Sequence, residues 1–242
     1  LNTLSGKTSG TITATISDGD MATLAGITST GNNLTISVTD ASVVATALTA
    51  LDAKTTGQLN VSASNNLTGT YTEVDAVLDA TTITGRATAT ATLSDTSISV
   101  ANANLIAAKT TGAITATITE TDLDTLMGTG ALAGITDAGN VNNFSVTVAC
   151  QTAEDTTTTA TELVETVNAA DIITLNALTN SVVAVTAPTV SGSYADLTTV
   201  YAANSPADLS TRTISGLETK AVTVTDAAGI TLTEAQAADD FS

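Results

Sequence analysis

The feature that most constrains the fold is a short strand-like segment that recurs along the whole chain. In each copy apolar residues alternate with Thr, Ser or Asn, an arrangement that puts the two kinds of residue on opposite faces of a strand. The spacing lengthens towards the C-terminus, from 22 residues between starts at 12 and 34 to 40 residues between starts at 182 and 222. This recurrence predicts repeated thin layers rather than one thick globular interior. The eight segments are residues 11–17, 34–39, 59–64, 87–93, 114–119, 144–150, 182–187 and 222–225.

Helical patterns occupy several of the intervals between these strands. They have apolar residues three or four positions apart, as in residues 42–54, 72–80, 100–109, 161–178 and 195–203. A Ser or Thr three residues before an acid has the spacing of a capping box, and six such pairs each lie at or near a predicted helix start. These pairs are Ser17/Asp20, Thr70/Glu73, Thr119/Asp122, Thr159/Glu162, Ser193/Asp196 and Thr231/Glu234.

Strand and helix in alternation predict parallel strands with right-handed crossovers. A doubly wound sheet, covered by helices on both faces, would have continuously apolar strands. Here one strand face is apolar and the other is rich in Thr and Ser, which favours helices on one side only. The sequence thus predicts an α/β fold, a right-handed α/β solenoid of about eight strand–helix units with one parallel sheet, helices on one face and a Thr-rich opposite face. The single array spans residues 1–242, with units near 1–32, 33–57, 58–85, 86–112, 113–142, 143–180, 181–220 and 221–242.

Two short signatures mark the joints of this array. Lys7, Lys54 and Lys109 each precede a Thr-Ser-Gly or Thr-Thr-Gly sequence. We expect each lysine in the last turn of a helix, where it complements the helix dipole, with Gly112 and its counterparts as left-handed caps. The second signature consists of Gly, Ile and Thr or Ser in either order, at residues 26–28, 83–85, 134–136, 214–216 and 229–231.

Composition excludes several classes of function. The chain has 24 acidic and 6 basic residues, a net charge of −18, and no His. Binding to nucleic acid or to an anionic membrane needs basic patches, so neither partner is expected. No apolar run approaches the roughly 20 residues of a membrane helix. No phosphate-binding loop, nucleophile motif or Cys/His metal spacing is present, and we expect neither an enzyme nor a cofactor.

A few acidic residues and the single cysteine are the remaining candidates for site residues. Asp18, Asp20, Asp122 and Asp124 could bind calcium, because carboxylates in turns suit that ion. The alternative is that they are acids at helix N-termini, favoured by the helix dipole. Cys150 ends an apolar alternation and is expected to be a buried small hydrophobe, with an intermolecular disulfide as the other possibility.

The polar strand faces carry many of the 54 threonines. Stacked in a parallel sheet, they would form a flat array like that of ice-binding proteins, with ice or a crystalline polysaccharide as ligand. The alternatives are that Thr simply has high β propensity or packs against another copy. The residues of this binding or packing face are Thr11, Thr13, Thr15, Thr88, Thr90, Thr92, Thr115, Thr117, Thr119, Thr223 and Thr225.

The terminal segments lack the polar caps that usually close repeat arrays. Residues 1–7 resemble the last turns of a helix, and residues 234–242 resemble the start of one. We therefore expect a segment of a longer array, or a subunit that associates end to end.

Three segments carry related motifs: Leu-Asp-Ala-Lys-Thr-Thr-Gly at 51–57, Leu-Thr-Gly-Thr-Tyr-Thr-Glu-Val at 67–74 and Val-Ser-Gly-Ser-Tyr-Ala-Asp-Leu at 190–197. They resemble units of the large Thr/Ala-rich repeat proteins of marine cyanobacterial cell surfaces. The resemblance covers most of the chain, although its longer C-terminal units depart from the pattern, and it carries over no catalytic residue. It implies an extracellular structural or adhesive role: a subunit or segment of a cell-surface filament, surface layer or giant adhesin, with the Thr-face binding module as the alternative.

Overall fold

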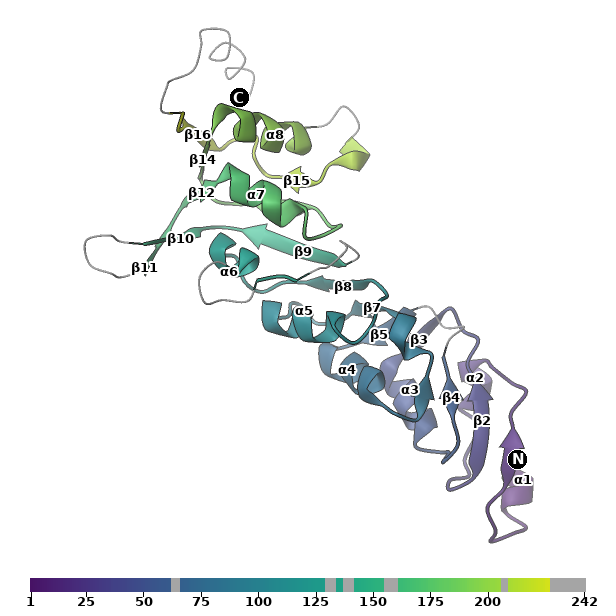
Figure 1. The fold of residues 1–242 in the computed structure, drawn as a ribbon. Coiled ribbons are helices and arrows are strands. Elements are labelled where there is room, and N and C mark those ends of the chain that lie inside the picture. The colour runs from purple at the N-terminus through teal and green to yellow at the C-terminus, as the bar shows by residue number, and fades with distance from the viewer. Residues whose placement is uncertain (62–65, 129–133, 137–141, 155–160, 206–208, 227–242) are drawn as a thin grey trace. The chain divides into compact units, whose positions relative to one another are not determined.

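The computed structural model describes residues 1–61, 66–128, 134–136, 142–154, 161–205 and 209–226. It has the α/β class, with parallel sheets and helices (Figure 1). The chain divides into two compact units, the first made of Leu1–Thr96 and Leu105–Ala116 and the second of Ser97–Asn104 and Thr117–Ser242.

The first unit contains two parallel sheets. One has the order β1-β2-β4-β6, and the other contains β3, β5, β7 and β8 in that order. The chain passes from a strand of one sheet to a strand of the other and then through a helix, and this passage is called a repeat below. Helices α3 and α4 of successive repeats pack side by side (Figure 1). The elements are α1 (Asn2–Ser5), β1 (Thr13–Thr15), α2 (Met21–Leu24), β2 (Asn33–Ser37), β3 (Ser42–Val44), α3 (Ala45–Asp52), β4 (Leu59–Asn60), β5 (Asn66–Gly69), α4 (Tyr71–Asp79), β6 (Ile83–Thr84), the 3-10 helix η1 (Arg86–Thr88), β7 (Thr90–Leu93), α5 (Val100–Ala107) and β8 (Ile114–Thr117). The last two, α5 and β8, each contain a boundary between the units.

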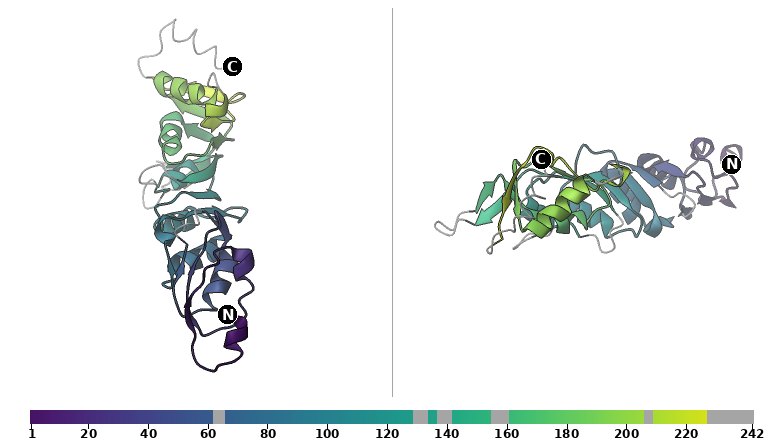
Figure 2. Two further views of the ribbon diagram at one scale, coloured as in Figure 1. Left: turned by 90° about the vertical axis from the view of Figure 1, so that its right-hand side faces the viewer. Right: turned by 90° about the horizontal axis from the view of Figure 1, so that it is seen from above.

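The second unit also has two parallel sets of strands, β9-β13-β15 and β12-β14-β16, and an antiparallel hairpin of β10 and β11. Helices α7 and α8 lie side by side (Figure 2). The elements are α6 (Leu123–Met127), β9 (Asn143–Val148), β10 (Gln151–Glu154), β11 (Thr161–Val164), β12 (Thr166–Asn168), α7 (Ala169–Asn176), β13 (Val183–Val185), β14 (Thr189–Gly192), α8 (Tyr194–Asn204), η2 (Leu209–Thr211), β15 (Ile214–Ser215) and β16 (Ala221–Val224).

The core follows the alternation seen in the sequence. In β2, Leu34 and Ile36 are fully buried while Asn33, Thr35 and Ser37 are exposed. Buried Leu, Ile and Val side chains from the helices complete the interior, and Phe144 of β9 is the largest fully buried side chain in the described residues. A narrow aliphatic interior suits short strands and helices, because few bulky rings have to fit between them.

Each predicted strand has a counterpart in the structure, but the prediction of one parallel sheet is wrong. Several repeats contain a second short strand directly before the helix, and it belongs to a different sheet from the first. The predicted helix over residues 42–54, for example, divides into strand β3 and helix α3, and residues 161–168 form β11 and β12 rather than the start of α7. Residues 234–242 lie outside the described part of the chain.

Candidate functional site: contacts that join successive repeats

The contact between neighbouring repeats is built around a threonine that follows a helix. The Thr55 hydroxyl lies 2.9 Å from the carbonyl oxygen of Leu34 and 3.1 Å from that of Asn32, in the preceding repeat. It also accepts hydrogen bonds from the N–H groups of Leu34 (2.8 Å) and Gly57 (2.9 Å). Thr55 is buried, with 8% of its surface exposed. One side chain thus satisfies backbone groups of two adjacent strands that would otherwise be buried without partners.

The same arrangement, called the threonine turn below, occurs twice more between repeats in the part of the chain that the structure describes. The Thr110 hydroxyl donates to the carbonyl of Ala89 at 2.7 Å, and the Thr179 hydroxyl to that of Phe144 at 2.7 Å. Each hydroxyl also accepts a bond from the N–H two residues later, at 3.0 and 3.1 Å, which is the geometry of a Ser/Thr turn. The sequence therefore encodes both the local turn and its attachment to the preceding repeat.

Glycine is needed in two of these turns because the neighbouring backbone comes very close. A Cβ atom on Gly57 would lie 2.3 Å from the carbonyl oxygen of Leu34, and one on Gly112 would lie 2.3 Å from that of Ala89. Neither glycine has a positive φ angle. The prediction of left-handed helix caps at these positions is therefore wrong, and close approach of two strands is the physical reason for the glycine.

The predicted position of the lysines in the last helical turn is also wrong. Helices α1, α3 and α5 end at Ser5, Asp52 and Ala107, so Lys7, Lys54 and Lys109 each lie two residues beyond a helix. Sequence reasoning missed this regular offset.

Lys109 instead forms ion pairs with the preceding repeat. Its Nζ lies 2.6 Å from Oδ1 of Asp75 and 2.8 Å from Oδ1 of Asp79, both in α4. The hydrogen bonds to Asp75 and then Asp79 raise the pKa of Lys109 above its ordinary value. Lys109 thus links the turn after α5 to α4 electrostatically, whereas the hydroxyl of Thr110 links the same turn to Ala89, just before β7.

An asparagine explains part of the Gly-Ile-Thr signature. The Asn2 amide donates to the carbonyl of Gly26 at 2.7 Å and accepts from the N–H of Thr28 at 3.1 Å. Asn104 makes the same pair of bonds with residues 134 and 136, at 2.7 and 2.9 Å. In these two copies of the signature, an asparagine side chain from a helix bonds to the backbone of both the first and the last residue, an arrangement called the asparagine clamp below. The copy at residues 229–231 lies outside the described residues.

The reversed signature has a different role, which the sequence pattern did not separate. Gly85 and Gly216 have φ angles of 83° and 88°, and each directly follows a two-residue strand. Glycine is favoured here because other L residues rarely adopt a left-handed conformation.

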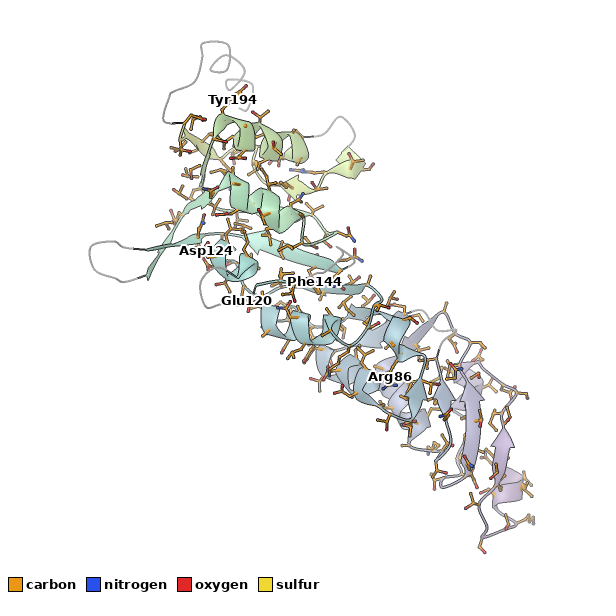
Figure 3. All side chains as sticks on the ribbon, in the orientation of Figure 1. Arg86, Glu120, Asp124, Phe144 and Tyr194 are labelled. Carbon is orange, nitrogen blue, oxygen red and sulfur yellow. The ribbon has the colours of Figure 1, made fainter. Side chains whose placement is uncertain are left out.

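Acidic side chains close the helix N-termini of the preceding repeat. The carboxylate of Glu120 accepts a bond from the N–H of Val100 at 2.9 Å, and that of Asp226 accepts from the N–H of Tyr194 at 2.7 Å. Figure 3 labels Glu120 and Tyr194. The first N–H groups of a helix have no partner within the helix and favour negative charge. Asp40 and Asp95 make the same bond to the N–H groups of Met21 and Tyr71, at 2.9 and 2.5 Å.

The four calcium candidates do not form one cluster. Asp20 and Asp122 are the N-caps of α2 and α6 and accept bonds from backbone N–H groups of those helices. Asp124 accepts a bond from Gln151 at 3.2 Å, and Asp18 is exposed (Figure 3 labels Asp124). Within the described ranges, no group of three or more His, Cys, Asp and Glu side chains could hold a metal ion.

The capping boxes also differ in detail from the sequence pattern. Thr70 and Glu73 form the complete reciprocal pair at α4, and the Ser193 hydroxyl accepts from the N–H of Asp196 at α8. At α2 and α6 the aspartate itself is the N-cap, and Ser17 and Thr119 are not. The pairs at 159/162 and 231/234 include residues outside the described part.

The predicted threonine face is divided among different sheets. Thr13 and Thr15 are exposed on β1, Thr90, Thr92 and Thr115 lie on β7 and β8, and Thr223 lies on β16 of the second unit. Thr92 is in register between Thr68 and Thr115, a column that the sequence analysis did not include in full. Of the remainder, Thr88 lies in η1, Thr117 ends β8, and Thr11, Thr119 and Thr225 lie just outside strands.

Cys150 is half-buried and is not part of a disulfide. Burial, and next the nearby charge of Asp122, raise the pKa of its thiol. A raised pKa disfavours the reactive thiolate. The side chain is less buried than the sequence pattern predicted, because Cys150 lies two residues beyond the end of β9.

Comparison of the chain with protein-family models, with curated proteins and with solved structures finds no match. Among the described helices, none has the length and hydropathy needed to span a membrane. The polar groups described above are arranged to join one repeat to the next, so the candidate functional site is this set of contacts and the strand edges where the set is incomplete.

Proposed function

We propose that the protein is an extracellular structural repeat protein, a right-handed α/β solenoid that forms a segment of, or a subunit in, a cell-surface filament, surface layer or giant adhesin. The observation that carries the proposal is the threonine turn, which joins successive repeats at Thr55, Thr110 and Thr179. In a solenoid each repeat contacts mainly its neighbours, so length is added without a new fold. The proposal assigns no catalytic role to the chain.

The acidity of the chain supports an exposed role in a salty medium. A net charge of −18 keeps separate molecules apart at low ionic strength, and salt screens that repulsion over about 10 Å or less. The acids also have local uses, since several of them close helix N-termini of adjacent repeats. Solubility and cohesion between repeats thus come from the same residue class.

Immunogold electron microscopy of the organism that produces the protein tests this function. Antibodies raised against the purified chain should label filaments or a layer outside the cell, with a regular axial repeat. Pre-immune serum is the control for nonspecific label. Label confined to the cell interior, or on dispersed single molecules, would contradict the proposal.

The second candidate is a surface-binding module for ice or polysaccharide. It has support from the register of Thr68, Thr92 and Thr115, which places three hydroxyl-bearing side chains at about 4.8 Å intervals along one sheet. If this column binds, Thr92→Arg should abolish thermal hysteresis or polysaccharide pull-down, while Thr46→Arg, at an exposed position of α3, should not. Absence of both activities from the unmodified chain rejects this candidate.

A further inference from the structure

The first and last described repeats are copies of two repeats that adjoin in the middle of the chain. Residues 7–20 match residues 109–122, with Lys-Thr, Gly, Ile-Thr-Ala-Thr-Ile and the final Asp at equivalent positions. Residues 214–226 likewise match residues 83–95, from the Ile and Gly at the start to the Asp at the end.

The structure agrees with this second match. Gly85 and Gly216 share a left-handed conformation. Asp95 and Asp226 accept the same kind of bond, from the N–H groups of Tyr71 and Tyr194.

The contact between the two middle repeats shows how residues 214–226 and residues 7–20 would pair. Strand β7 pairs in parallel with β8, with Ala91 opposite Ile114 and Thr92 opposite Thr115. The N–H of Ala91 donates to the carbonyl of Ala113 at 2.9 Å. The threonine turn at Thr110 completes the contact.

The corresponding edges of β1 and β16 are open in the described part of the chain. The carbonyl of Ile12 and the N–H of Ile16 bond to β2. Because successive residues of a strand point their backbone groups to opposite edges, those of Thr13 and Thr15 point away from β2. An open edge of this kind presents unpaired N–H and C=O groups to another strand.

The same argument applies to β16 at the other end. The N–H groups of Ala221 and Thr225 point towards β14 and donate to the carbonyl oxygens of Pro188 and Gly192. The backbone groups of Val222 therefore point to the open edge, as those of Ala91 point to β8.

Apolar exposure at these edges supports the same conclusion. Val222 is 36% exposed, whereas its counterpart Ala91 is 2% exposed. Ile12 is half-buried, whereas its counterpart Ile114 is fully buried. The free edges thus retain apolar surface that the equivalent internal contact removes from water.

We propose that two copies of the chain associate end to end, with β16 of one copy paired in parallel with β1 of the other. Val222 lies opposite Ile12 and Thr223 opposite Thr13, as Ala91 lies opposite Ile114 and Thr92 opposite Thr115. This inference deepens the proposed structural function and rests on it. The two surfaces differ, so the contact is heterologous and can continue from copy to copy.

One internal interaction is missing from the end-to-end contact. Lys7 is the counterpart of Lys109, but Thr198 and Ala202 stand in α8 where α4 has Asp75 and Asp79. The contact therefore depends on the strand pairing and on the Thr8 turn, whose hydroxyl now bonds only to the N–H of Gly10 among the described residues. Repulsion between two copies of charge −18 also opposes association, so added salt should strengthen it.

Analytical ultracentrifugation of the full chain in about 0.5 M NaCl, where screening acts within about 4 Å, tests the contact. Association should rise with protein concentration, and Val222→Asp should abolish it by placing a charge in the dry strand contact. Val182→Asp is the matched control, because Val182 is 43% exposed but is not on an open edge. Unchanged melting of both variants by circular dichroism would show that they fold.

Two results would overturn the proposal. One is a chain that stays monomeric up to about 1 mM, the range of very weak complexes. The other is association that Val222→Asp leaves unchanged, which would place the contact on another surface.

Disulfide trapping tests the register independently of affinity. In a Cys150→Ser background, the pair Thr13→Cys and Thr223→Cys brings two thiols onto adjacent strands about 4.8 Å apart, within disulfide range. Mild oxidation should give a ladder of dimers, trimers and larger species. A chain with only one of these two cysteines should form dimers and nothing larger. The pair Thr15→Cys and Thr223→Cys should form disulfides more slowly. An equal ladder from the shifted pair, or none from the first pair, would refute the register.

These results are separable from the test of the structural function. Labelled extracellular filaments together with a monomeric purified chain would reject only the end-to-end contact. Self-association of a protein found solely inside cells would reject only the extracellular function.

Discussion

The turns at Thr8 and Thr55 have nearly the same sequence but different surroundings. In both, the threonine hydroxyl accepts a bond from the N–H two residues later, at 3.0 and 2.9 Å. Only Thr55 also bonds to a preceding strand within the described residues. The comparison shows that the turn forms from local sequence, whereas its contribution to stability depends on the neighbouring repeat.

The largest difference is expected for Thr→Val at the two positions. Thr55→Val should lower the free energy of unfolding by about 3 kcal/mol, because it leaves buried N–H and C=O groups without partners. Thr8→Val should lower it by less than about 0.5 kcal/mol, as for most surface substitutions. Denaturant unfolding monitored by circular dichroism measures both values. Equal losses would show that the turn, and not the contact between repeats, is the source of stability.

A smaller difference is expected when a methyl group replaces a glycine hydrogen. Gly57→Ala should cost about 2 kcal/mol because the new Cβ would meet the carbonyl of Leu34, and overpacking costs about 1–3 kcal/mol. Gly10→Ala has only the hydroxyl of Thr8 nearby, at 3.4 Å, and should be close to neutral. Thermal unfolding of the two variants provides the measurement. A costly Gly10→Ala would mean that the turn itself requires glycine.

The smallest effect is expected from the lysines of these turns. Lys109→Met should cost about 0.5–1 kcal/mol, since the ion pairs with Asp75 and Asp79 are partly exposed. Lys54→Met should have less effect, because no ion pair of Lys54 is found among the described residues.

The pKa of Lys109 gives this prediction a pH dependence. Because folding raises that pKa, its stabilisation is fully present below the unfolded pKa of about 10.4 and is lost as pH rises through the folded pKa. The difference in melting temperature between the unmodified chain and Lys109→Met should therefore shrink above about pH 10. A difference that stays constant to pH 12 would indicate lost packing of the lysine stem rather than lost charge.

Much of the fold could be predicted from the sequence because its main strands alternate clearly. The predicted segments 34–39 and 144–150, for example, contain all but the first residue of β2 and of β9. The second strands were missed because they are short and run directly into helix caps. Ser42–Val44 reads as the start of a helix, although its backbone pairs with β5.

The contacts between repeats were harder to predict than the elements. The Lys-Thr-Thr-Gly signature identified the correct residues, but its partners lie more than 20 residues away in the sequence, as Leu34 does from Thr55. The asparagine clamp gives no local signal at all, because Asn104 and its partner Thr136 are 32 residues apart. Spacing between distant residues becomes informative only once the register of the repeats is known.

The bonds made by the basic side chains have a consequence for proteolysis. Proteases of the trypsin type insert a Lys or Arg side chain into an acidic pocket, and the chain offers only six such residues in 242. Arg86 is bonded to the carbonyls of Leu78 and Ile83, and Lys220 to that of Thr186. Cleavage at these two sites requires a repeat to open first, so their resistance to digestion follows from the stability of the contacts between neighbouring repeats.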